Sequence, residues 1–197
     1  MPKMYPGYRD EVRKKIVAEA LALFTEKGYS ATTMGEIAAR LGVTKAAIYQ
    51  YYPSKLDLFS AVAEYQRQRL AGILERSFGG SDVAEGAAVL FDNLLRFIDS
   101  SREIYSDMIA VAHRDGGLRK IMEEDLKGDL SIIETFIERR KARGLIHSSI
   151  DPKILAMACH ALINGLMFDV MMGMDPAEAK KVWLDAVDDL LRVHERK

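Results

Sequence analysis

The sequence of 197 residues contains little cysteine and little proline, one and five residues respectively. The single cysteine, Cys159, excludes an intrachain disulfide, and we expect the chain to lie in the reducing cytoplasm. No stretch shows the alternating β-branched residues that are typical of strands. Long stretches rich in Ala, Leu, Glu, Lys and Arg favour helices instead. These features predict an all-α fold.

Long apolar runs are also missing. No run reaches the roughly 18–20 residues that cross a bilayer. Pro2, Pro6 and Gly7 interrupt the segment where a signal sequence would stand. Hydrophobic residues make up 49% and charged residues 29%, a composition that excludes a disordered chain. We therefore expect a folded cytoplasmic protein that does not associate with a membrane.

Signatures of catalysis and of metal binding are missing as well. The four histidines have no ligand spacing, and Cys159 beside His160 is not by itself a metal site. The sequence has no nucleotide-binding loop and no nucleophile signature. We expect no enzyme, no cofactor and no metal.

Charge is distributed unevenly along the chain. Residues 1–60 hold nine Lys or Arg against six Asp or Glu, whereas the remainder holds 19 against 23. A basic N-terminal segment before an acidic remainder favours a polyanionic partner for that segment alone.

Apolar periodicity and capping residues predict about nine helices. The first runs from about Asp10 to Lys27 and ends at Gly28. Thr33 and Glu36 form a capping box for the second, and Thr44 caps the third. The other expected helices span about 44–51, 54–78, 82–99, 102–113, 118–143, 152–172 and 176–195. We predict an N-terminal domain over residues 1–54 and a helical domain over residues 55–197.

Residues 33–52 have the pattern of a helix-turn-helix, two short helices joined by a tight turn at Gly42. The second helix of this motif enters the major groove of DNA. Here it has small residues that permit close approach, a lysine that can reach guanine or phosphate, and side chains that form hydrogen bonds. They are Thr44, Lys45, Ala46, Ala47, Tyr49 and Gln50.

The segment GYSATTMGEIA at 28–38, followed by GVTKAAIYQYYPSK at 42–55, resembles the DNA-binding domain of the TetR (tetracycline repressor) family. The resemblance covers about residues 9–60. It implies a homodimeric bacterial transcriptional regulator, usually a repressor, whose last two helices pair across the dimer. By this similarity the phosphate contacts would be Thr33, Thr44, Tyr49, Tyr51 and Lys55. The better candidates for base contacts are Lys45, Ala46 and Gln50. Thr33 can equally be a cap alone, and Lys55 a solvated surface residue.

Residues 80–197 resemble no particular family. Small residues in the last two helices, among them Ala158, Ala161 and Gly165, allow close helix packing, either across a dimer or within one core. Ten methionines suit an adaptable apolar pocket, although core packing also explains them. The residues expected near this pocket are Met108, His113, Phe136, His160, Asn164 and Phe168. His160 and Asn164 could orient a ligand or form hydrogen bonds within the protein.

The sequence therefore predicts a regulator that binds a near-palindromic operator in double-stranded DNA. A small apolar or amphipathic effector would release it. The alternative is a helical ligand-sensing or protein-interaction module whose N-terminal domain does not bind DNA. An α-helical enzyme is a weaker third interpretation.

Overall fold

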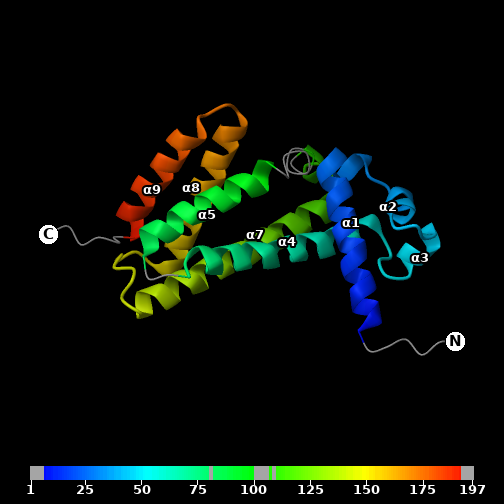
Figure 1. Cartoon of the computed structure of the whole chain (residues 1–197), viewed down its shortest axis with the longest axis horizontal. Coiled ribbons are helices and arrows are strands. Elements are labelled where there is room, and N and C mark those ends of the chain that lie inside the picture. The colour runs from blue at the N-terminus through cyan, green and yellow to red at the C-terminus, as the bar shows by residue number, and fades with distance from the viewer. Residues whose placement is uncertain (1–6, 80–81, 100–106, 108–109, 192–197) are drawn as a thin grey trace. The chain divides into compact units, whose positions relative to one another are not determined.

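The structure of the chain is a computed structural model that describes residues 7–79, 82–99, 107 and 110–191. Every regular element within these residues is a helix (Figure 1), which confirms the expected all-α fold. The helix expected over 102–113 falls largely outside the described residues, although residues 110–112 are helical. The helices are α1 (Tyr8–Ala31), α2 (Met34–Arg40), α3 (Lys45–Tyr49), α4 (Lys55–Ser77), α5 (Val83–Asp99), α7 (Gly116–Ala142), α8 (Pro152–Met171) and α9 (Pro176–Leu191).

The chain divides into two compact units, which we call the head and the body. The head comprises residues 1–66 and 101–125, and the body comprises residues 67–100 and 126–197. This division differs from the boundary expected between residues 54 and 55. The long helices α4 and α7 contribute residues to both units. The head therefore includes residues 101–125, which come later in the sequence than the expected N-terminal domain.

One apolar core joins the helices of the head. Ile37 of α2 and Ile48 of α3 are almost completely buried, as is Leu118 of α7. The burial of Leu118 explains why the later segment belongs to this unit, because an exposed leucine would forfeit roughly 2 kcal/mol of apolar burial. The remaining buried core residues of the head are Ile16, Val17, Ala20, Leu23, Phe24, Tyr29, Met34, Ala38, Tyr52, Leu58, Phe59 and Val62.

Side-chain caps fix where most helices begin. The expected caps at Thr33 and Thr44 are present, and Asp82 and Asp151 accept hydrogen bonds from the first amides of α5 and α8. Gly116 and Gly117 were expected to separate two helices, but they form the first turn of α7. The Asp115 carboxylate accepts hydrogen bonds from the amides of Gly117 and Leu118 at 2.9 and 3.0 Å. This cap allows a helix to start on two glycines.

The end of α1 is interrupted at Gly28. This residue has φ 82° and ψ 165°, a conformation essentially restricted to glycine. One further turn then leads to Thr32, whose buried hydroxyl donates to the carbonyl oxygen of Gly28 at 2.8 Å and lies 3.3 Å from that of Leu23. The helix expected to stop at Lys27 therefore bends there and ends at Ala31.

The body has a separate core formed mainly by α5, α8 and α9. Trp183 of α9 is 3% exposed, and its indole N–H donates to the carbonyl oxygen of Ala87 in α5 at 2.9 Å. The Lys180 ammonium pairs with the Asp92 carboxylate at 2.7 Å on the same two helices. These contacts fix α9 against α5.

Replacement of Gly28 tests the bend in α1. A Cβ atom at Gly28 would lie 3.0 Å from the Asp107 carboxylate, whereas a Cβ at Gly42, with φ 67°, would meet nothing within 4 Å. We expect Gly42→Ala to cost about 1–2 kcal/mol from backbone strain, and Gly28→Ala to cost about 1 kcal/mol more. Urea unfolding of the two variants measures the difference. Equal losses would show that neither the glycine-restricted conformation of Gly28 nor its contact with Asp107 adds to the cost.

Candidate DNA-binding surface

Side-chain caps fix the start of each helix of the helix-turn-helix, α2 and α3. Thr33 and Glu36 form the predicted capping box at the start of α2. The Thr44 hydroxyl accepts a hydrogen bond from the amide of Ala47 at 3.2 Å at the start of α3. Gly42 has φ 67°, the left-handed conformation that lets the chain reverse within a few residues. The two helices therefore have a fixed relative orientation within the head.

The outer side of α3 carries the residues expected to meet DNA. Ile48 is 1% exposed and anchors the helix, whereas Tyr49 is 41% exposed. The Lys45 ammonium lies 5.7 Å from the centre of the Tyr49 ring, which places a cation and a phenol side by side. The exposed residues of this surface are Thr44, Lys45, Ala46, Tyr49 and Gln50.

Thr33 and Tyr51 flank this surface. Thr33 is exposed, but its hydroxyl donates to the Glu36 carboxylate at 2.8 Å and accepts from the Glu36 amide at 3.2 Å. Tyr51 is half-buried, and Tyr52 is buried in the head core. Thr33 therefore has a capping role whether or not it contacts DNA.

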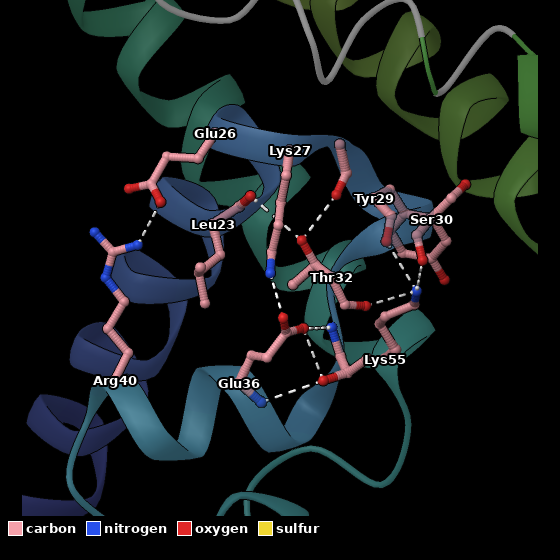
Figure 2. Close-up of polar contacts among 11 residues, drawn as sticks. Leu23, Glu26, Lys27, Tyr29, Ser30, Thr32, Glu36, Arg40 and Lys55 are labelled. Carbon is pink, nitrogen blue, oxygen red and sulfur yellow. Dashed lines mark hydrogen bonds and ion pairs between the residues drawn. The ribbon is translucent and has the colours of Figure 1, made fainter.

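Lys55 has a different role from the one expected for it. Its ammonium donates to the carbonyl oxygens of Tyr29, Ser30 and Thr32 at 2.8, 3.3 and 2.9 Å, as Figure 2 shows. An ammonium has three N–H donors, and all three are occupied by the end of α1. Burial lowers the pKa of Lys55, and Asp107 and Glu36 oppose that shift. These contacts give Lys55 a structural role at the end of α1.

Two other cations near α2 have acidic partners. Lys27 pairs with Glu36, and Arg40 pairs with Glu26 at 2.7 Å (Figure 2). Arg40 also pairs with Glu19 at 3.2 Å. Their charges are largely compensated within the protein. Lys27 and Arg40 therefore do not supply the excess positive charge expected of the N-terminal segment.

A contact with Asp107 was not apparent from the sequence. The Asp107 carboxylate accepts hydrogen bonds from the Ser30 amide at 2.6 Å and from the Ser30 hydroxyl at 2.9 Å. Gly28 permits this approach because it has no Cβ atom. The only local signal was the glycine, and nothing in the sequence pairs residues 77 positions apart.

Of the six residues expected around a ligand pocket, one is not described, one belongs to the head and four belong to the body. Met108 lies outside the described residues, and His113 is exposed on the head. Phe136 is buried in the core of the body, where its ring lies 4.7 Å from that of Phe78. The remaining three, His160, Asn164 and Phe168, lie on α8.

The pair at His160 and Asn164 makes a local contact. The Asn164 amide donates to the backbone oxygen of His160 at 2.8 Å, one helical turn earlier. Burial lowers the pKa of His160, so its imidazole favours the neutral form. Asn164 and Phe168 are exposed. The sequence left two roles open for this pair, orienting a ligand or forming hydrogen bonds within the protein. The bond from Asn164 to His160 is of the second kind.

Helix α8 is long and apolar enough to cross a membrane by length and composition, although only 33% of its most apolar window is buried. The core helices of soluble proteins meet the same criterion, so this helix is weak evidence for a membrane span. Several apolar residues of this helix are nevertheless exposed.

Comparison with known proteins identifies the family. The model of the tetR family of bacterial regulatory proteins matches residues 16–62. The model of the C-terminal domain of BetI-type transcriptional repressors matches residues 66–192. The chain therefore belongs to the TetR family of transcriptional regulators, and its helix-turn-helix is the DNA-binding motif of that family.

Individual relatives agree with this assignment. The HTH-type transcriptional regulator AcrR of Shigella flexneri is 36% identical over 91 residues, which are 46% of this chain and 42% of that protein. The chain spans about half the length of several curated relatives that it matches. A solved TetR-family structure from Rhodococcus sp. has a TM-score of 0.79 at 19% identity, covering 92% of this chain and 99% of its own.

A second solved structure is a complex of SmeT with triclosan. SmeT is the repressor of a multidrug efflux pump of Stenotrophomonas maltophilia. It has a TM-score of 0.70 at 24% identity, covering 91% of this chain and 90% of its own. At 19% and 24% identity, the similarity to these two solved structures shows a shared fold and no more.

The capping box predicts a specific dependence of stability on pH. Lys27 and the hydroxyl and amide of Thr33 lower the pKa of Glu36 from 4.5 to about 2. A lowered folded-state pKa means that the stabilisation is complete above about pH 4.5 and is lost as the pH falls towards 2. We expect Glu36→Gln to be less stable than the wild type at neutral pH, with a difference that narrows below pH 4.5.

Thermal unfolding at a series of pH values measures this difference. Glu124→Gln is the control, because Glu124 lies on an exposed face of α7 beside Lys120. A difference between Glu36→Gln and the wild type that stays constant from pH 6 to pH 3 would contradict the assignment.

Proposed function

We propose that the chain is a transcriptional repressor that binds a near-palindromic operator as a homodimer and is released by a small apolar or amphipathic effector. One observation carries the DNA-binding part: Ile48 is buried while the neighbouring Lys45 and Tyr49 are exposed. An anchored short helix with an exposed polar face suits insertion into a major groove. The match to BetI-type repressors supports repression as the mode of action.

The exposed residues of α3 divide into two roles. Lys45, Ala46 and Gln50 are the proposed base contacts, since they lie at the exposed ends and sides of a helix thin enough to enter the groove. Thr33, Thr44, Tyr49 and Tyr51 are the proposed phosphate contacts, because hydroxyl and phenol groups donate well to phosphate oxygens. Lys55 supports these contacts indirectly by holding the chain that precedes α2.

The proposed dimer interface is the exposed face of α8 together with part of α9. Ile154, Met157, Phe168 and Met172 are 51–67% exposed and recur at helical spacing along one side of α8. Val182 of α9 is 40% exposed. On the same side of α8, a Cβ atom at Gly165 would meet nothing within 4 Å, so another helix can approach closely. A second copy of the chain would cover this apolar stripe.

The proposed effector site lies in the body. His160 remains a candidate for orienting a polar group of the effector, because it is half-buried and its neutral form can donate or accept a hydrogen bond. Asn164 and Phe168 are better assigned to the exposed side of α8. The SmeT complex supports an effector such as triclosan in this fold. The effector must bind more tightly to the dimer state that does not fit the operator.

Replacement of the exposed α3 residues tests the DNA-binding part. A duplex selected from a random-sequence library by the wild-type protein serves as the probe. We expect Lys45→Ala and Tyr49→Ala each to weaken binding about 10- to 100-fold in a gel-shift titration while the protein stays folded and dimeric. Wild-type affinity should also fall steeply as salt concentration rises.

The matched control is Lys127→Ala, which removes an exposed lysine of α7 in the body. It should bind the duplex like the wild type. Retained affinity in Lys45→Ala and Tyr49→Ala would favour the alternative, a sensing or protein-interaction module whose head does not bind DNA.

A charge on the exposed side of α8 tests the dimer. Phe168→Glu would place a carboxylate inside the proposed interface, which we expect to weaken dimerisation about 100-fold or more. Sedimentation equilibrium measures the association constant. Val89→Glu is the control, because Val89 is similarly apolar and 40% exposed but lies on α5. Unchanged association of Phe168→Glu would locate the interface elsewhere.

A further inference from the structure

Two arginines of α1 lie against the tyrosines that follow α3. The Arg9 guanidinium carbon is 5.8 Å from the centre of the Tyr51 ring. The Arg13 guanidinium carbon is 5.4 Å from the centre of the Tyr52 ring, and the same group is 3.5 Å from the backbone oxygen of Tyr51. Both arginines are exposed. The C-terminal end of α3 therefore has two cations beside it that come from a different helix.

The position of these arginines on α1 is set by the core. Arg9 and Arg13 are one helical turn apart, and the same side of the helix continues to Ile16 and Ala20, which are buried. The next cation, Lys14, is rotated by about 100° from Arg13, and Lys15 by about 200°. Because the buried residues fix the rotation of α1, Arg9 and Arg13 are held on the side that meets Tyr51 and Tyr52.

The charges of these two arginines remain available to a ligand. Among the described ion pairs of the head, Lys27 and Arg40 have carboxylate partners, and Lys55 donates to carbonyl oxygens. Arg9 and Arg13 lie against aromatic rings, and Arg13 also donates to the backbone oxygen of Tyr51 at 3.5 Å. These neutral partners orient a guanidinium without neutralising its charge. A planar guanidinium held in this way is well suited to phosphate oxygens.

We propose that Arg9 and Arg13 bind backbone phosphates of the DNA beside the groove that α3 enters. The DNA-binding surface then extends from Lys45 at one end of α3 to the first two turns of α1 at the other. This inference rests on the proposed DNA-binding function and adds two residues outside the helix-turn-helix. The expected contacts are independent of base sequence, because phosphates are common to every site.

The salt dependence of binding tests this proposal. The full-length dimer is titrated with the duplex selected from the random-sequence library over a range of salt concentrations. Each phosphate contact contributes roughly 0.9 to the slope of log affinity against log salt concentration. Arg9→Ala and Arg13→Ala should each lower that slope by about 1.8 in a dimer, which loses two contacts. Affinity for a duplex of scrambled sequence should fall by a similar factor.

Three further variants separate charge from structure. Arg13→Lys keeps the positive charge and should retain the slope of the wild type. Lys15→Ala removes a cation from the opposite side of α1 and should leave the slope unchanged. Arg139→Ala removes an arginine of the body that pairs with Glu75, and it should also leave the slope unchanged. Thermal unfolding checks that each variant is folded.

The outcomes distinguish this proposal from the function on which it rests. If Arg9→Ala and Arg13→Ala keep the wild-type slope while Lys45→Ala loses affinity, DNA binding stands and the α1 contacts are overturned. A lowered slope in Arg13→Ala that Arg13→Lys does not restore would also overturn them, because charge would not be the cause. If the wild type and Lys45→Ala bind every duplex alike and without salt dependence, the proposed function itself fails.

Discussion

The burial of Ile48 is the interaction on which the DNA-binding surface depends. Helix α3 has five residues, too few for a helix to be stable in isolation. Its conformation and rotation therefore come from tertiary packing, and Ile48 supplies that packing with 1% of its surface exposed. A helix anchored on this side must expose Lys45, Ala46 and Tyr49 on the other. The caps at Thr33 and Thr44 then fix where α2 and α3 begin.

The head is larger than its helix-turn-helix. Leu118 is completely buried in the head core, and Asp107 binds both the amide and the hydroxyl of Ser30. Lys55 donates to the neighbouring carbonyl oxygens of Tyr29 and Thr32 at the same end of α1. Lys55 of α4 and Asp107 thus hold the chain where α1 ends and leads to α2. A displacement of Asp107 would break its hydrogen bonds to Ser30, three residues before the cap of α2 at Thr33.

Local features of this fold were predictable from the sequence, and long-range contacts were not. The spacing of Thr33 and Glu36, the turn at Gly42 and the cap at Thr44 are each contained within a few residues, and all were expected and found. The contact between Asp107 and Ser30 joins residues 77 positions apart, and no pattern in a single sequence signals it. Lys55 was expected at a phosphate because its motif is near DNA, yet carbonyl oxygens occupy its ammonium. The expected pocket rested on residue type. Residue type alone does not distinguish Phe136, which is buried in a core, from Phe168, which is exposed.

The most direct test of the central claim maps which part of the DNA lies against α3. A photoreactive phenylalanine analogue in place of Gln50 would be irradiated in the complex of the full-length dimer with the selected duplex, and the crosslinked bases identified. The account predicts crosslinks to bases in the major groove at two positions, about one helical turn (roughly 34 Å) apart or somewhat more. Crosslinks to protein alone, or an even distribution along the duplex, would contradict it.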